Sequence, residues 1–312
     1  MNNTYEASHI SVKAINQYRG RDIFPYISLR YYLYNSATRS SRWAQDAAVK
    51  MVISRSSTPY FRSKHYKELD TSSEIVYRDI YLPGANEALA EASLLDECSK
   101  HPGIFSNHPS VFSYELTKST DLSGIYLPFM SGVIKRHSTI SSICSNNTEF
   151  RVHTVDIKRF YPSISHELAV SAWDHHARLA GFDVFRDLGN KIITDYRNSS
   201  HSGDNGILTG PMFSHLIANL VLREFDEYCS TKLPAHYIRY VDDISLIGTQ
   251  QQIDHSINII KSKLESLGFH LHDKNKANKN ILVSAEEWLS CANINNSNHI
   301  STQWMKLIFG IK

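Results

Sequence analysis

Two adjacent acids, Asp242 and Asp243, interrupt an apolar stretch that covers residues 236–248. β-Branched and aromatic residues on both sides of the pair predict a strand, a tight turn and a second strand, with the acids at the turn. Because side chains alternate along a strand, the tip of such a hairpin can direct both carboxylates into one cleft. Two carboxylates so close repel each other at neutral pH unless a cation lies between them. The stretch therefore predicts a divalent metal site, and ordinary Asp-rich turn chemistry is the alternative.

A third acid, Asp156, lies near the end of another predicted strand, residues 151–157. Between this strand and the hairpin, Gly210 and Pro211 introduce an apolar helix. Phosphoryl transfer by two metal ions needs carboxylates on adjacent strands that hold the ions roughly 3.5 to 4 Å apart. Asp156 and Asp242 can supply that pair, so the order of these elements favours metal-dependent phosphoryl transfer.

Three segments together resemble motifs A, B and C of reverse transcriptases, in the same order along the chain. They read D-I-K-R-F-Y-P-S-I from Asp156, G-I-L-T-G-P-M-F-S-H-L-I-A-N-L from Gly206, and R-Y-V-D-D from Arg239. They are most similar to the unknown-group and abortive-infection reverse transcriptases of bacterial antiphage defence, and less similar to retron and group II intron enzymes. The resemblance covers about residues 64–278. It implies an α+β right-hand polymerase fold with fingers, an antiparallel-sheet palm, and a reduced or absent thumb.

The resemblance also implies the catalytic and metal-binding residues. Asp156 and Asp242 would ligate two Mg²⁺ ions, Asp243 would support them, and Ile157 belongs to the same metal site. Mn²⁺ is the alternative ion. On this interpretation the chain is an RNA-directed DNA polymerase that adds deoxynucleotides to a 3′-hydroxyl.

Residues implied to bind the nucleotide lie within the first and second of these motifs. Tyr161, five residues after Asp156, falls where reverse transcriptases place the aromatic gate under the incoming sugar, and Phe160 belongs to the same site. A bulky ring there excludes a 2′-hydroxyl, which implies deoxynucleotide use; the alternative is that both rings are core aromatics. Thr209 and Gly210 match the motif B loop, where glycine permits close backbone approach. Retroviral enzymes have Gln where this chain has Thr209.

Basic residues are implied to contact the triphosphate. Arg78 resembles the arginine of the fingers, with Lys64 or Lys67 as its partner, because guanidinium and ammonium donors offset developing phosphate charge. Lys274 resembles the motif D lysine, and Lys276 is its rival. Solvated charges on a strand are the alternative for Arg78 and for the two lysines near it.

Few residues follow motif D, so the implied enzyme would hold its duplex poorly by itself. Its implied partners are deoxynucleoside triphosphates, an RNA template such as a dedicated noncoding RNA, the DNA product, and a partner subunit or a second copy of the chain. Two alternative functions stay open. One is a retron-type reverse transcriptase that makes a small RNA-linked DNA. The other is a weakly active, polymerase-fold RNA-binding subunit of a defence complex.

Composition sets the broad class of protein. The 312 residues are 42% hydrophobic and 21% charged, which is typical of a folded domain. No apolar run approaches the roughly 20 residues of a membrane span, and the N-terminus lacks a signal-peptide pattern, so a cytoplasmic protein without a membrane partner is expected. The 4 cysteines and 16 histidines show no paired spacing, which argues against disulfides and zinc.

Charge and periodicity divide the chain. Residues 1–64 are strongly basic and residues 65–249 are acidic, which suits a basic arm that grips phosphate, although a solvated basic face is the alternative. We therefore predict a helical N-terminal arm (1–58), fingers (59–150), a palm (151–280) and a short thumb remnant or tail (281–312). The predicted helices are residues 41–53, 86–98, 167–180, 184–196, 213–229 and 253–267. Further strands are predicted at 75–82, near 124–134 and at 269–279.

Overall fold

The computed structural model describes residues 3–19, 31, 48–56, 60–69, 75–200, 206–272 and 279–295. The chain divides into two compact units that alternate along the sequence. Unit 1 comprises Met1–Ser106, Tyr114–Leu127 and Arg159–Leu222, and unit 2 comprises Asn107–Ser113, Pro128–Lys158 and Arg223–Lys312. Helices and sheets occur in both units, which confirms the predicted α+β class.

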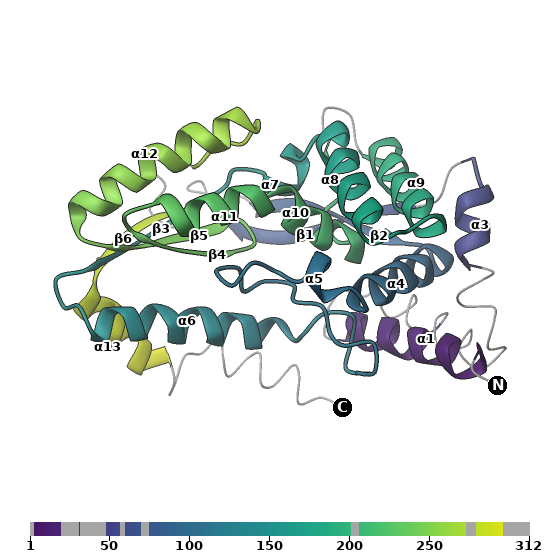
Figure 1. Cartoon of the computed structure of the whole chain (residues 1–312), viewed down its shortest axis with the longest axis horizontal. Coiled ribbons are helices and arrows are strands. Elements are labelled where there is room, and N and C mark those ends of the chain that lie inside the picture. The colour runs from purple at the N-terminus through teal and green to yellow at the C-terminus, as the bar shows by residue number, and fades with distance from the viewer. Residues whose placement is uncertain are drawn as a thin grey trace. The chain divides into compact units, whose positions relative to one another are not determined.

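Unit 1 is built around one buried helix. Its described helices are α1 (Asn3–Arg19), α3 (Ala48–Ser54), α4 (Ala85–Ser99), α5 (Pro102–Phe105), α7 (Phe160–Ser163), α8 (His166–Leu179), α9 (Val184–Ser199) and α10 (Met212–Val221). Helix α4 is buried over most of its length and packs against α1, α3, α9 and α10 (Figure 1). The predicted helices at 86–98, 167–180 and 184–196 are confirmed.

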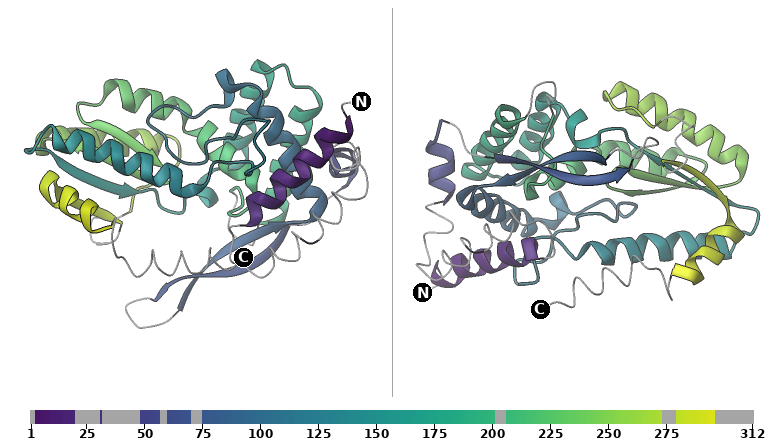
Figure 2. Two further views of the ribbon diagram at one scale, coloured as in Figure 1. Left: turned by 90° about the horizontal axis from the view of Figure 1, so that it is seen from below. Right: turned by 180° about the vertical axis from the view of Figure 1, so that it is seen from behind.

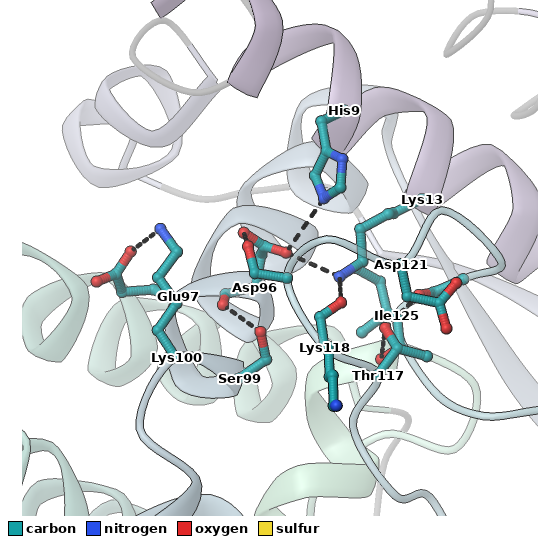
Figure 3. Close-up of polar contacts among 12 residues, drawn as sticks. His9, Lys13, Asp96, Glu97, Ser99, Lys100, Thr117, Lys118, Asp121 and Ile125 are labelled. Atoms are coloured by element: carbon teal, nitrogen blue, oxygen red, sulfur yellow. Dashed lines mark hydrogen bonds and ion pairs between the residues drawn. The ribbon is translucent and has the colours of Figure 1, made fainter. Parts of the chain in front are cut away.

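A buried ion pair joins α1 to α4. The ammonium of Lys13 lies 2.8 Å from the carboxylate of Asp96 and also donates to the carbonyl oxygen of Lys118 at 3.2 Å (Figure 3). The hydroxyl of Ser119 donates to the second oxygen of Asp96 at 3.0 Å. Since Lys13 is only 1% exposed, this charge is balanced by direct contacts, and its role is to fix α1 on the core.

Two long strands of unit 1 form an antiparallel ribbon. Strands β1 (Tyr60–Leu69) and β2 (Ile75–Pro83) pair so that Tyr60 lies opposite Pro83. The ribbon extends away from the helices of the same unit (Figure 2). The predicted strand at 75–82 is confirmed, whereas its partner β1 was not predicted, because polar residues alternate poorly with apolar ones there.

Unit 2 contains a four-stranded antiparallel sheet in the order β4-β5-β3-β6. The strands are β3 (Arg151–Asp156), β4 (His236–Tyr240), β5 (Asp243–Gly248) and β6 (Asn280–Ser284). Helices α6 (Phe129–Ser145) and α13 (Ala285–Asn295) cover one face, and α12 (Gln250–Ser266) covers the other (Figure 1). Val152, Ile238 and Ile247 of the sheet form a core with Ile140 and Cys144 of α6. The predicted strand 151–157, hairpin 236–248 and helix 253–267 are confirmed.

Helix α6, which begins at Phe129, contradicts the prediction of strands near residues 124–134. Its serines and threonines lower helix propensity, which hid the helical spacing of Phe129, Val133, Ile140 and Cys144. In the folded chain these hydroxyls bond back along the helix, as when Thr139 donates to the carbonyl oxygen of Lys135 at 2.8 Å. Such bonds satisfy the polar side chains and leave the apolar stripe to decide the structure.

The single long helix predicted at 213–229 is also wrong. Helix α10 ends at Val221, and a separate helix, α11 (Arg223–Lys232), begins after Leu222. Every residue of α10 is buried, whereas α11 buries one stripe that includes Phe225 and Cys229. The break coincides with the end of unit 1 at Leu222, so the two helices serve different cores. Of the helix predicted at 41–53, the structure describes only α3, from Ala48.

Candidate functional site

The acidic turn of unit 2 has an unusual backbone. Strands β4 and β5 pair Tyr240 with Asp243, which leaves Val241 and Asp242 in the turn. Val241 has φ of 56°, a left-handed conformation that costs a β-branched residue free energy. Its N–H donates to the hydroxyl of Ser113 at 2.9 Å, and its carbonyl oxygen accepts from the guanidinium of Arg239 at 2.8 Å. These bonds hold the strained turn that presents the acids.

A buried ion pair between Arg239 and Asp226 supports the same turn. Arg239 is 0% exposed and donates to both carboxylate oxygens of Asp226, each at 2.7 Å. The hydroxyl of Tyr237 donates to the same carboxylate at 2.7 Å. Because two parallel bonds fix the plane of the guanidinium, the arginine that bonds Val241 cannot turn away.

The three predicted acids come together at one end of the sheet. Asp156 lies directly opposite Asp243 on the neighbouring strand, and the N–H of Ile157 donates to the carbonyl oxygen of Asp242 at 3.0 Å. Burial, reinforced by the charges of Asp156 and Asp243, raises the pKa of Asp242 to about 6. Burial also raises the pKa of Asp243. The predicted convergence of these acids, including Ile157 beside them, is therefore present within unit 2.

Cationic side chains of unit 2 lie against the acids. Lys279 forms an ion pair with Asp156, and Nε2 of His272 lies 3.5 Å from the other oxygen of that carboxylate. Arg136 of α6 lies 3.9 Å from Asp243 and donates to the hydroxyl of Ser245 at 2.8 Å. Burial lowers the pKa of Lys279, but the bond to Asp156 and its charge outweigh that effect, so the pKa is raised. The ammonium therefore stays charged as the counter-ion of Asp156.

The chemistry of these acids suits a metal ion, but their present arrangement does not. By chemistry they do, because carboxylate oxygens are the ligands that Mg²⁺ prefers and a cation would relieve the repulsion that raises the pKa of Asp242. By present geometry they do not, since no three His, Cys, Asp or Glu side chains in the described part of the chain are arranged to hold a metal ion. Asp156 is directed at Lys279 instead, so metal binding requires that lysine to move.

The predicted gate lies in unit 1. The hydroxyl of Tyr161 is hydrogen-bonded to Nδ1 of His215 at 2.6 Å, and His215 stacks on Tyr114 with ring centroids 3.7 Å apart. Phe160 is only 3% exposed, and its ring lies 5.6 Å from that of Tyr161. Phe160 therefore packs behind Tyr161 as a core residue, whereas Tyr161 is half-buried.

The predicted motif B loop pairs with strand β2 of the same unit. The N–H of Tyr81 donates to the carbonyl oxygen of Thr209 at 2.8 Å. Gly210 has φ of 124°, and a Cβ there would lie 2.5 Å from the carbonyl oxygen of Tyr81. Only glycine fits this approach to β2, whereas the predicted approach of Gly210 to the templating pair and the new nucleotide stays a prediction.

A buried carboxylate holds the helix that follows this loop. Glu91 of α4 is 0% exposed and accepts from the N–H of Phe213 at 3.1 Å, near the start of α10. The hydroxyls of Tyr60 and Tyr196 donate to its other oxygen at 2.8 and 2.9 Å. Burial raises the pKa of Glu91 to about 7, although all of these donors favour the charged form.

The predicted basic residues are only partly described. Lys64 and Arg78 lie exposed on β1 and β2, and the ammonium of Lys64 lies 5.9 Å from the ring centre of Tyr77. The side chain of Lys67 and all of Lys274 and Lys276 lie outside the described residues. Residues 270–272, part of the predicted strand 269–279, run beside β3, where the N–H of His272 donates to the carbonyl oxygen of Asp156 at 2.9 Å.

The sequence did not identify Lys279, His215 or Glu91, because each acts through a contact between distant segments. His215 gave a weak signal, as a polar residue in an otherwise apolar helix.

No helix in the described part of the chain is long and apolar enough to span a bilayer. Comparison of the whole chain with protein-family models and with curated proteins finds no match.

Proposed function

We propose that this protein is a nucleotidyltransferase that polymerises deoxynucleotides on an RNA template, a reverse transcriptase. The observation that carries the proposal is the meeting of Asp156, Asp242 and Asp243 at the ends of adjacent antiparallel strands. Burial, with the charges of Asp156 and Asp243, raises the pKa of Asp242, so added positive charge beside these acids would be favourable. Nucleotidyl transfer on a triphosphate has the matching requirement for cations beside the reacting phosphate.

In this proposal Asp156 and Asp242 hold Mg²⁺ and Asp243 supports them. Held by these carboxylates, the ions would supply positive charge that favours deprotonation of the attacking 3′-hydroxyl and offsets the charge of the leaving pyrophosphate. The chain's own residues then orient the substrate. Arg78 and Lys64, both exposed on the ribbon, donate to the triphosphate, and Gly210 lets the backbone approach the base pair.

The gate at Tyr161 is tied to the acids by the chain itself. Five residues separate Asp156 from Tyr161 and span at most roughly 18 Å when fully extended. In the proposal the ring of Tyr161 takes the place of the aromatic gate and excludes a 2′-hydroxyl. The aromatic residue at this position supports deoxynucleotides rather than ribonucleotides as substrates.

Incorporation of labelled deoxynucleotides tests the proposal directly. Purified protein, with its co-purifying nucleic acid, receives one labelled nucleotide at a time with Mg²⁺, and the reaction is repeated with EDTA. Asp242→Asn combined with Asp243→Asn should reduce incorporation at least ~1,000-fold, because transition-state charge loses its counter-ions. Asp254→Asn, an exposed acid on α12 of the same unit, is the matched control and should keep wild-type incorporation.

The product separates the remaining alternatives. Full incorporation by the double variant would refute the proposal, and no incorporation by wild type would favour an RNA-binding subunit. A labelled product that stays attached to RNA during denaturing electrophoresis, and becomes smaller after RNase treatment, would indicate the retron-type reaction. A role in antiphage defence is also proposed, from motif resemblance, and is tested by comparing phage plaques on cells expressing wild type or the double variant.

A further inference from the structure

We infer that His215 is a positioning residue that sets the orientation of the Tyr161 ring, and through it the selectivity between deoxyribonucleotides and ribonucleotides. This inference rests on the proposed function and adds to it a residue that determines specificity. It is carried by a short hydrogen bond of 2.6 Å between the Tyr161 hydroxyl and Nδ1 of His215. All residues involved belong to unit 1.

Backbone contacts fix the position of the segment that carries Tyr161, independently of its side chain. Residue Arg159 takes a left-handed φ of 51° and starts the short helix α7. Behind this turn, Ser165 pairs with Gly206, and a Cβ on Gly206 would lie 2.1 Å from the carbonyl oxygen of Pro162. Glycine is therefore required where the two segments touch. The remaining freedom of Tyr161 lies in its side-chain torsions.

His215 is itself held on several sides. It is 3% exposed, in a helix that is buried all round. Tyr114 stacks on its imidazole with an interplanar angle of 5°, and the ring of Tyr126 meets it edge-on at 6.0 Å. Tyr126 is anchored in turn, because its hydroxyl donates to the carbonyl oxygen of Met212 at 2.9 Å. The imidazole of His215 is thus held in place, and its hydrogen bond can restrict the orientation of the Tyr161 ring.

Tyr114 shows that this arrangement is costly. Its φ of 52° is a left-handed conformation that non-glycine residues rarely adopt. Such strain persists where surrounding contacts over-determine it, and it often marks a functional constraint. With this backbone conformation the Tyr114 ring stacks on His215 and also meets the ring of Tyr126 edge-on at 5.5 Å. Core packing alone would be served by an apolar residue at 215, without a buried imidazole to satisfy.

The geometry gives the hydrogen bond a defined task. An aromatic gate discriminates by the position of its ring, since a 2′-hydroxyl is excluded only where the ring blocks it. A Tyr ring that can swing about its first torsion leaves room for that hydroxyl part of the time. The bond to the buried imidazole restricts this motion, while the Tyr161 side chain stays half-buried and partly exposed to solvent.

Four variants test the inference by the ratio of kcat/KM for dGTP to kcat/KM for GTP. Tyr161→Ala removes the ring and should give the largest loss of discrimination. Tyr161→Phe removes only the hydroxyl, and His215→Phe keeps a ring for stacking but removes the acceptor. Each of these should lower the ratio roughly 2- to 10-fold, the equilibrium factor of one hydrogen bond. His215→Asn can present an acceptor near the place of Nδ1 and should keep more of the ratio than His215→Phe.

A double variant separates a tether from two independent effects. Tyr161→Phe with His215→Phe should be no worse than either change alone, because both remove the same bond. His175→Phe, an exposed histidine on α8, is the matched control and should keep the wild-type ratio. Circular dichroism and thermal unfolding verify that each variant is folded.

Three results would overturn the inference. A wild-type ratio in both Tyr161→Phe and His215→Phe would show that ring bulk alone discriminates, and losses that multiply in the double variant would show separate effects. If His215→Phe does not fold, a wild-type ratio in Tyr161→Phe is sufficient to refute the tether. Absence of any incorporation by wild type is distinguishable from these results, since it rejects the proposed function and the inference with it.

Discussion

Two clusters of charged side chains in unit 2 differ in how their carboxylates are balanced. Asp226 receives two bonds from Arg239 and one from Tyr237, all of them buried. The three acids at the strand ends instead have cations that reach them from partly exposed positions, and the Lys279 side chain is 32% exposed. We call the first the locked cluster, because its charged groups are buried and bonded to one another. We call the second the open cluster, because another cation can reach it in place of the partly exposed lysine. We therefore interpret the locked cluster as structural, and it is the open cluster to which the proposed function assigns the chemistry.

Breaking the locked cluster should have the largest effect on stability. Arg239→Met leaves the carboxylate of Asp226 buried without its partner and removes the bond to Val241. The expected loss is about 3–5 kcal/mol in the free energy of unfolding, as for other broken buried ion pairs. Urea denaturation followed by circular dichroism measures it.

Two further variants sharpen that result. Arg151→Met, an exposed arginine of β3, is the control and should change the unfolding free energy by less than about 0.5 kcal/mol. Arg239→Met combined with Asp226→Leu should recover much of the loss, because no uncompensated charge then remains buried. A loss below about 1 kcal/mol for Arg239→Met would mean that the pair is not locked.

Glu91 of unit 1 extends the comparison to a buried carboxylate whose donors are neutral. Burial raises its pKa from the ordinary 4.5 to about 7, so the folded state keeps a proton that the unfolded state loses in between. The contribution of this group to stability is therefore complete below about pH 4.5 and is lost as the pH rises through about 7. The loss should be of order 3 kcal/mol, since each pKa unit corresponds to about 1.4 kcal/mol.

Chemical denaturation from pH 4.5 to 8 tests this behaviour. The stability of wild type relative to Glu91→Gln should fall by about 3 kcal/mol over that range, because the amide does not titrate. Glu97→Gln, which changes a partly exposed acid of the same helix, should show no such pH-dependent difference. A constant difference between wild type and Glu91→Gln would show that Glu91 is ionised throughout.

These clusters also show what the sequence could predict. Asp156, Asp242 and Asp243 were predictable because strand periodicity and turn chemistry act between neighbours in the chain. Gly210 was predictable for a similar reason, since a glycine before proline marks a special turn. The pairing that places Asp156 opposite Asp243 was not predicted, because the order of apolar runs does not decide which strands are neighbours or in what register they pair.

What the sequence could not predict depends on contacts between distant segments. Glu91 meets Phe213, and Tyr161 meets His215, only because whole helices pack together. Local propensity was misleading in α6, where hydroxyl side chains bond back to the helix and the apolar stripe decides. The strain at Val241 depends on Arg239 and Ser113, neither of which has any local pattern that indicates it.

The smallest expected effect concerns the open cluster, where Lys279 is the counter-ion of Asp156. Because the Lys279 side chain is 32% exposed although Asp156 is buried, Lys279→Met should cost about 1 to 2 kcal/mol in metal-free protein, less than the loss of the fully buried Arg239. If Mg²⁺ competes with the ammonium for the carboxylate, the variant should gain more stability from Mg²⁺ than wild type does, by the linkage of binding to folding. Thermal unfolding in EDTA and in a MgCl₂ series, at constant ionic strength, measures both quantities. Lys261→Met, an exposed lysine of α12, makes the same change of charge and should respond to Mg²⁺ as wild type does. An equal response to Mg²⁺ in all three proteins would mean that the Lys279 ammonium and the metal do not compete for Asp156. The counter-ion of the open cluster would then not be exchangeable.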